Sequence, residues 1–232
     1  MSDNRRKAIN FIKCIETEPN DYKVTEKNAI WIPLVVPLAF VPISFIVNTV
    51  STHDKVSKTA FIIAVVLTII ISVGLLFLGV IGKNKAYGMT KAFFGMRVSL
   101  SGFVALVPLC SLLIKHFSEE YSTINDEKYI SLIVVFFILM AITACLSACI
   151  TIHMIKKNHF KKDNARMLAA SIELLYVPLL VVGKIIGNSD NSYFGFFFMC
   201  MIMGYMIFKA TYYYLKLHYA QKYKLEYLLP RI

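Results

Sequence analysis

The stretch AFIIAVVLTIIISVGLLFLGVI, Ala60–Ile81, contains no charged residue and is followed directly by the basic segment GKNK over residues 82–85. A helix needs about 20 mostly apolar residues to cross the hydrocarbon core of a bilayer. The run is continuously apolar rather than alternating. A helix therefore satisfies its backbone groups in lipid, whereas an isolated strand cannot. This stretch predicts a membrane-spanning helix that ends at a charged connector.

Five further apolar runs of similar length are expected to be spans, namely Ile30–Val50, Val98–Phe117, Tyr129–Ile152, Leu168–Gly187 and Phe194–Leu217. The chain is 57% hydrophobic, above the ~45–50% that is typical of soluble domains. The connectors are too short to hold a folded soluble domain. The predicted fold class is all-α: a polytopic integral membrane helical bundle with six transmembrane helices in three hairpins.

Lys and Arg are distributed unevenly between the predicted connectors. The two terminal tails and the connectors after the second and fourth spans are rich in them, and the alternate connectors are not. Short cytosolic connectors carry an excess of Lys and Arg. We therefore expect both termini to be cytosolic. The net charge of +11 is then expected to face anionic lipids of the inner leaflet rather than nucleic acid.

These patterns divide the chain into three parts. Residues 1–28 are expected to form a cytosolic tail with an amphipathic helix in the headgroup layer, because Ile9 and Ile12 share one helix face beside basic residues. Residues 29–217 form the six-helix transmembrane domain, and residues 218–232 form a helical cytosolic tail. The abundance of Ile, Lys, Phe and Asn indicates a low-GC genome, so we expect a multi-pass protein of the bacterial cytoplasmic membrane.

Two ionisable residues lie well inside predicted spans, Glu173 in the fifth and Lys209 in the sixth. A lone charge at mid-span costs about 2.5–3.5 kcal/mol. One interpretation places both residues on a substrate or ion path, and the other pairs them with each other to fix helix packing. Pro42 and Pro178 are further candidates for the path. Proline inside a helix removes a hydrogen bond, so we expect the first, third and fifth spans to be kinked.

The segment Ala86–Met96 follows the second span, and its apolar residues recur at helical spacing among basic ones. It is predicted to form a short helix on the cytosolic side. Such a segment can rest on the membrane or contact another protein. The candidate contacts to a partner protein are Lys91, Phe93, Phe94 and Arg97.

The fourth span concentrates small residues in its second half, namely Thr143, Ala144, Cys145, Ser147, Ala148, Cys149 and Thr151. Small residues let helices approach closely in lipid. The pattern predicts a packing face, either within the chain or between protomers. The two cysteines are interpreted as small core residues rather than as metal ligands.

The sequence contains no G-x-x-x-x-G-K-[ST] phosphate loop, no H-E-x-x-H and no G-x-S-x-G. We therefore expect no cofactor, no metal site and no enzyme activity in the chain itself. An integral membrane enzyme would need acids, histidines or cysteines clustered at one depth, and only Glu173 is available.

The predicted topology, the basic amphipathic N-terminal helix and the helical segment after the second span resemble the layout of exporter-type ABC permeases, including those for antimicrobial peptides. The resemblance implies a transporter membrane subunit that works with a separate ATPase as a homo- or hetero-oligomer. It also implies that Ala86–Met96 contacts the ATPase. The alternative is a non-transporting membrane binding protein with an immunity or regulatory role, which the compact connectors fit equally well.

Overall fold

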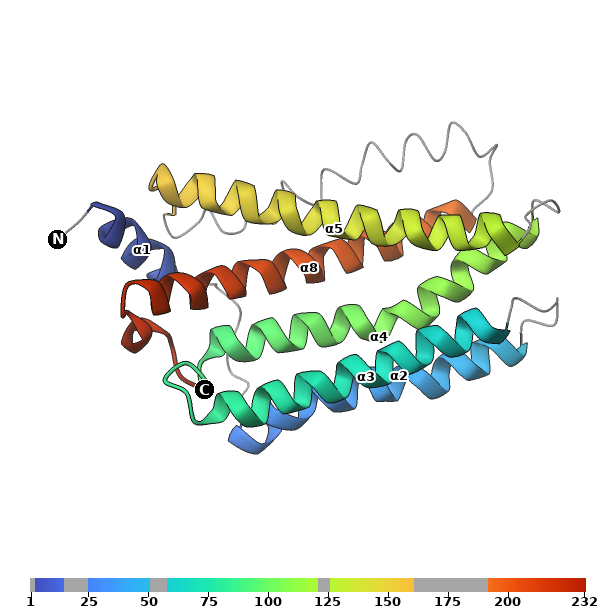
Figure 1. Ribbon diagram of the computed structural model, residues 1–232, viewed down its shortest axis with the longest axis horizontal. Helices are drawn as coiled ribbons and strands as arrows, with labels where there is room; N and C mark the ends of the chain where they lie inside the picture. Colours follow the sequence, from blue (N-terminus) through green and yellow to red (C-terminus); the bar gives the residue numbers. More distant parts are fainter. Residues whose placement is uncertain (1–2, 15–24, 51–57, 121–125, 161–191) are drawn as a thin grey trace.

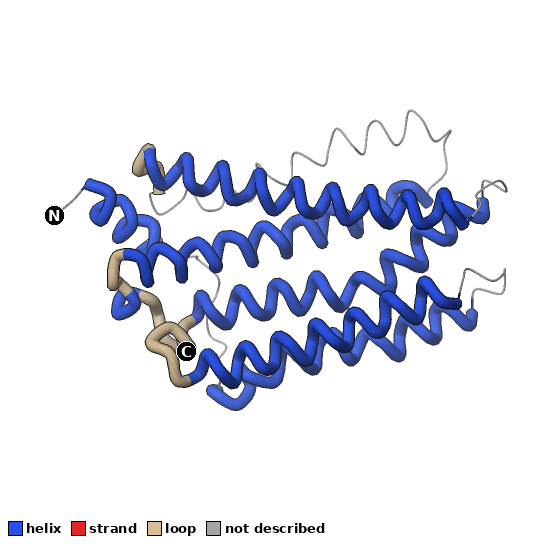
Figure 2. Tube along the Cα trace, in the orientation of Figure 1, coloured by secondary structure: helices blue, strands red, loops and turns tan. Residues whose placement is uncertain are grey.

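The computed structural model describes residues 3–14, 25–50, 58–120, 126–160 and 192–232. Within these residues the regular secondary structure is helical, and Figure 2 colours no strand among them. The predicted fifth span, Leu168–Gly187, lies outside the described residues, and so do Glu173 and Pro178. The all-α prediction is confirmed for the described part of the chain.

The long helices of the described residues lie side by side, and the short helix α1 lies against their end (Figure 1). The α-helices are α1 Asp3–Lys13, α2 Glu26–Val50, α3 Lys58–Lys83, α4 Lys91–Glu120, α5 Asp126–Lys156 and α8 Ser192–Lys222, and the 3-10 helix η2 is Glu226–Leu228. Four helices contain a segment long and apolar enough to cross a membrane, namely Lys27–Ile46, Phe61–Lys83, Lys91–Leu109 and Phe137–Lys156. The first four predicted spans are therefore confirmed as helices of spanning length and composition.

α3 is apolar on both its inward and its outward side. Its inward side combines buried small and polar residues such as Thr68 and Ser72 with buried apolar residues such as Leu75. Its outward side carries large apolar residues, and Ile70 and Phe77 are each 60% exposed. A surface helix of a water-soluble protein carries charged and polar residues on its outward side instead. The outward side of α3 is therefore suited to contact lipid chains.

Several buried hydroxyl groups of α3 and α5 form hydrogen bonds within their own helix. Thr68 and Ser72 of α3 donate to carbonyl groups one turn earlier in their own helix. Thr143, Ser147 and Thr151 of α5 do the same. Back-bonding of this kind gives each hydroxyl a partner where solvent cannot supply one.

The predicted packing face of α5 is confirmed for Thr143, Ser147 and Thr151, which are buried at a spacing of four residues. The core role predicted for Cys145 and Cys149 is wrong, because both side chains are exposed. Each cysteine follows a buried residue by two positions, which turns it by about 200° to the opposite side of a helix.

The bundle consists of two groups of helices, with α2, α3 and α4 in one and α5 and α8 in the other (Figure 1). They meet at the α4–α8 pair, the most extensive helix contact among the described residues. Two glycines of α4 allow the close approach. A Cβ atom at Gly95 would lie 2.6 Å from the ring of Tyr213, and one at Gly102 would lie 2.7 Å from the sulfur of Met206. Backbone contact through small residues is the usual way in which helices associate in lipid.

The separate helix predicted over Ala86–Met96 does not form. Turns occupy residues 84–89, and α4 begins at Lys91 and continues to Glu120 without a break. The cause is the N-cap at Thr90, whose hydroxyl oxygen accepts the Phe93 N–H at 3.3 Å. The aromatic and basic residues of this segment therefore belong to the first turns of α4.

α8 ends earlier than the sequence suggested. Lys224 takes the left-handed conformation with φ 54°, and the Leu225 N–H bonds to the Ala220 carbonyl at 2.7 Å. This closure is the Schellman type of helix end, in which an apolar residue packs back on the helix. Leu225 is fully buried, so the tail after α8 folds back instead of continuing as a long helix.

The outward side of α3 gives a direct test of lipid contact. In a cysteine-free background, a spin label at Ile70→Cys is expected to collide readily with oxygen and poorly with a water-soluble nickel chelate, because oxygen partitions into lipid. A label at Lys85→Cys, in the α3–α4 turn, serves as the control and should show the reverse. Equal access of the nickel chelate to both labels would contradict a lipid-facing α3.

Candidate functional site

One end of the bundle collects the chain ends and the basic connectors. Figure 1 shows α1, the C-terminus, the α3–α4 turn and the ends of α5 and α8 together at this end, which we call the basic end. Its exposed cationic residues are Arg5, Arg6, Lys13, Lys27, Lys83, Lys85, Lys91, Lys156, Lys157, Lys222, Lys224 and Arg231. Asp3 is held by Lys7 at 2.6 Å, and this hydrogen bond lowers the pKa of the Asp3 carboxyl. The surface is therefore strongly positive.

Arg97 of α4 joins three helices behind this surface. Its side chain is 2% exposed. Nε donates to the Leu75 carbonyl of α3 at 3.0 Å, and Nη1 donates to the Ala29 carbonyl of α2 at 2.9 Å. Nη2 donates to the neighbouring Ile30 carbonyl at 3.0 Å. One guanidinium group thus fixes the positions of α2, α3 and α4 relative to each other.

Two features of the sequence make this arrangement possible. Pro33 has no N–H, so the carbonyl of Ala29 lacks its ordinary helical partner and is free to accept from Arg97. Gly79 leaves room on α3, because a Cβ atom there would lie 2.2 Å from Nη2 of Arg97. The guanidinium carbon also lies 5.7 Å from the centroid of the Phe93 ring. Carbonyl dipoles and the ring face offset part of the cost of burying the charge.

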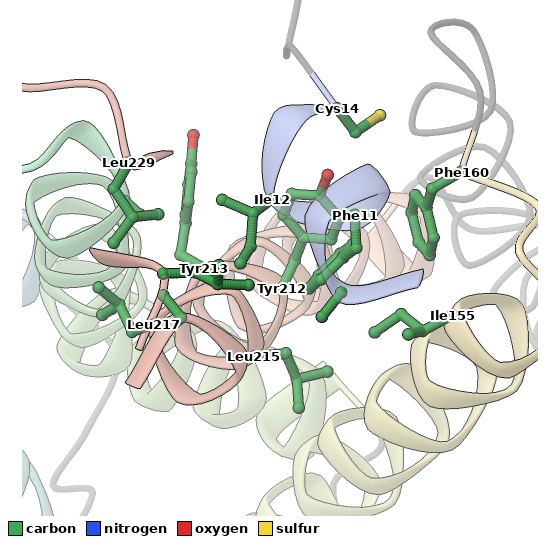
Figure 3. Close-up of a cluster of buried hydrophobic side chains, with 14 of the residues drawn as sticks. Phe11, Ile12, Cys14, Ile155, Phe160, Tyr212, Tyr213, Leu215, Leu217 and Leu229 are labelled. Atoms are coloured by element: carbon green, nitrogen blue, oxygen red, sulfur yellow. The ribbon is translucent and has the colours of Figure 1, made fainter. Parts of the chain in front are cut away.

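A second contact docks α1 against the ends of α8 and α5 (Figure 3). Phe11 is fully buried, and its ring centroid lies 4.7 Å from that of Phe160, 5.4 Å from that of Tyr212 and 6.0 Å from that of Tyr219. The sequence predicted that the apolar side of this helix faces lipid headgroups. In the structure, side chains of the protein itself cover it.

Lys216 of α8 completes the docking of α1. Its Nζ atom donates to the carbonyl of Cys14 at 2.9 Å, at the end of α1, and lies 4.8 Å from the centroid of the Tyr212 ring. The last carbonyl groups of a helix carry partial negative charge and have no partner within the helix. A buried ammonium group therefore binds the C-terminal end of α1 in a fixed position.

A third contact joins the C-terminal tail to the α3–α4 turn. Thr90 and Arg231 form an isolated antiparallel bridge. On either side, the Lys91 N–H donates to the Pro230 carbonyl at 2.8 Å, and the Ile232 N–H donates to the Met89 carbonyl at 3.0 Å. The tail thus connects the end of α8 with the start of α4.

The four residues predicted to contact a partner protein differ in their exposure to solvent. Lys91 is exposed and Phe94 is half-buried, whereas Phe93 and Arg97 are buried within the chain. Phe93 packs against α3, since a Cβ atom at Gly82 would lie 2.5 Å from its ring. Lys91 is the member of this set that presents its charge to solvent.

The predicted path residues are not brought together in the described part of the chain. Lys209 is half-buried on α8, and its Nζ lies 5.1 Å from the centroid of the Tyr205 ring. Pro42 is exposed on α2, whereas Pro33 and Pro37 of the same helix are buried. All three prolines lie within the continuous helix α2. Among the described residues, no group of three His, Cys, Asp or Glu side chains could hold a metal ion.

Sequence reasoning missed Gly79, Phe11 and Lys216. A glycine in an apolar helix followed by a basic residue on the next helix is a weak signal for a buried contact. Phe11 stood out only as one of several apolar residues in a basic tail. Nothing in the spacing of Lys216 distinguishes it from an exposed lysine. Comparison with protein-family models, with curated protein sequences and with solved structures found no match to this chain.

The contact between Arg97 and Gly79 can be tested with two alanine substitutions in one helix. Gly79→Ala is expected to lower the thermal midpoint of the purified protein, because its Cβ displaces the guanidinium and overpacking typically costs about 1–3 kcal/mol. Gly74→Ala is the matched control, because a Cβ atom there meets nothing within 4 Å. The two variants are compared by thermal unfolding in one detergent. Equal midpoints would contradict the packing of Arg97 on Gly79.

The docking of α1 makes a separate prediction. Phe11→Ala is expected to release α1. Truncating a buried Phe typically costs about 3–5 kcal/mol, which is a large share of the free energy that can hold a short helix in place. Amide hydrogen exchange of residues 3–13 should become faster in this variant. Asn4→Ala, at an exposed position of the same helix, should keep the exchange of the wild type. Unchanged exchange in Phe11→Ala would show that α1 is held by other contacts.

Proposed function

We propose that this chain is a multi-pass membrane protein with six spans in three hairpins and with the basic end in the cytosol. The four apolar helices of spanning length support part of this topology. α8, with 31 residues, is about 46 Å long, which exceeds the thickness of a hydrocarbon core of about 30 Å. The sequence places the remaining span at Leu168–Gly187. The concentration of exposed Lys and Arg at one end supports the cytosolic orientation, and the composition supports a bacterial cytoplasmic membrane.

We infer further that the chain is the membrane subunit of a transporter that works with a separate cytosolic ATPase. One observation carries this proposal: the α3–α4 turn and the C-terminal tail form a single hydrogen-bonded unit at the basic end. Through this unit, a protein bound to the basic end would act on α3, α4 and α8 together. ATP-driven transport needs such a connection, because the energy of a cytosolic subunit must move several spans at once.

The surface of this unit suits an acidic partner. Lys85, Lys91 and Arg231 are exposed on it, and Tyr227, four residues before Arg231, is 74% exposed. Tyrosine and arginine are enriched at the energetically important positions of protein interfaces, and the two lysines add positive charge that attracts an acidic surface. The substrate path proposed from the sequence, with Glu173, Lys209, Pro42 and Pro178, would lie further inside the membrane domain. The half-buried position of Lys209 on α8 is compatible with it.

A non-transporting membrane binding protein, with an immunity or regulatory role, is the second candidate. The three hydrogen bonds of Arg97 to backbone carbonyls favour it, because they hold α2, α3 and α4 in one arrangement. Transport requires helices to change their relative positions, whereas a binding protein does not. The two candidates therefore differ in whether an ATPase is coupled to the chain.

The test is to purify the tagged protein from its native host and to measure nucleotide hydrolysis of the complex in proteoliposomes. We expect a bound ATPase whose activity falls at least severalfold with Lys85→Glu/Lys91→Glu, because these substitutions reverse charge on the contact surface. Lys27→Glu, exposed at the start of α2, is the control and should leave the activity unchanged. A complex without nucleotide hydrolysis, in a strain that loses a protective phenotype when the gene is deleted, would favour the binding protein.

A further inference from the structure

The side of α1 that faces away from the bundle carries a stripe of polar residues. Arg6, Asn10 and Lys13 are spaced at i, i+4 and i+7 and therefore lie on one side of the helix. Arg6 and Lys13 are exposed, and Asn10 is half-buried. The apolar side of α1 is occupied by its contact with α8 and α5. Arg6 and Lys13 are thus the residues of this stripe that remain available to a partner outside the chain.

The end of α5 meets this stripe at its middle. Asn10 Nδ2 donates to Asn158 Oδ1 at 2.9 Å, which joins residues 148 positions apart in the sequence. Asn158 has φ 57°, the left-handed conformation that asparagine tolerates at helix ends. Lys156 and Lys157, which directly precede it, are both exposed. Two cations of α1 and two at the end of α5 therefore lie close in sequence to the part-buried hydrogen bond that joins the two segments.

The acidic residue of α1 does not neutralise this cluster. Asp3 forms its ion pair with Lys7 at 2.6 Å, one turn apart on the same helix. Arg6, Lys13, Lys156 and Lys157 form no ion pair with the described residues, so we take their charges to be available to an external anion. Guanidinium and ammonium groups form charge-assisted hydrogen bonds with phosphate oxygens, which are among the strongest in proteins.

The position of the cluster relative to the predicted membrane surface indicates that the anion is a lipid headgroup. α1 packs on Tyr212 and Tyr219, which lie on either side of Leu217, the end of the predicted sixth span. Tyr214, on the same stretch of α8, is 56% exposed. Tyrosine is enriched at membrane interfaces, because its ring is apolar and its hydroxyl needs water. α1 therefore lies at the level of the lipid headgroups.

We propose that Arg6, Lys13, Lys156 and Lys157 bind the phosphate group of an anionic phospholipid in the leaflet at the basic end. The docked α1 supplies a preformed electrostatic site, whereas an amphipathic helix would bind by inserting its apolar side. Each basic residue near an anionic membrane strengthens binding by about fivefold, and the effect decreases with salt. The proposal does not depend on transport or on an ATPase.

The test measures the association of spin-labelled phosphatidylglycerol with the full-length protein in phosphatidylcholine bilayers, relative to spin-labelled phosphatidylcholine. We expect the wild type to prefer phosphatidylglycerol. In the variant Arg6→Gln/Lys13→Gln/Lys156→Gln/Lys157→Gln, the association constant of phosphatidylglycerol relative to phosphatidylcholine should fall at least tenfold. The matched control Lys27→Gln/Lys85→Gln/Lys91→Gln/Lys224→Gln removes the same charge from other exposed positions at the same end and should keep most of it.

Three outcomes would overturn the proposal. An equal loss in both variants would mean that the whole basic end attracts lipid diffusely. No preference in the wild type would mean that the cluster has no anionic lipid bound. Full displacement of the labelled lipid by soluble glycerol phosphate would assign the cluster to a free anion. Amide hydrogen exchange of residues 3–13 in the cluster variant confirms that α1 is still docked, so that loss of preference reports on the charges themselves.

Discussion

The guanidinium group of Arg97 is the constraint on which the arrangement of the first three long helices depends. It is buried, and it donates to carbonyl groups of α2 and α3 from its own position on α4. A charge placed this way is strongly unfavourable unless its donors are satisfied, so the surrounding backbone must be held to within hydrogen-bond distance. The proline that frees the carbonyl of Ala29 and the glycine that admits the side chain are both required for this geometry.

The basic end of the bundle is organised by contacts between segments that are distant in sequence. α1 is held by Phe11 among three aromatic rings and by the ammonium group of Lys216 at its last carbonyl. The C-terminal tail is held to the α3–α4 turn by backbone hydrogen bonds on both sides of Thr90. Both chain ends are therefore fixed structural elements. A surface that is built from several fixed elements can bind a lipid headgroup or a partner protein without losing conformational entropy, because its segments are already ordered.

The pattern of residues inside the bundle fits a membrane environment. In water, apolar side chains would be drawn inward, whereas lipid contact removes that preference. Small and polar residues then occupy the helix contacts, as Gly95 and Gly102 do between α4 and α8. Hydroxyl groups at buried positions bond to their own helix, as Thr68 and Ser147 do. Because small and polar residues can fill the helix contacts in this way, large apolar residues such as Ile70 can face outward.

The sequence by itself determined the all-helical class, the four confirmed helices of spanning length and the presence of a packing face of small residues on α5, of which the structure buries Thr143, Ser147 and Thr151. Each follows from local properties, namely run length, apolar content and helical spacing. It did not determine where α4 begins. The helical spacing of apolar residues extends to both sides of Thr90, so it did not show that the helix begins at this N-cap. Nor did it reveal the positions of Arg97, Phe11 and Lys216. Only the tertiary structure decided these, because the carbonyl of Ala29, the ring of Phe160 and the carbonyl of Cys14 come from distant segments that the fold alone brings within reach.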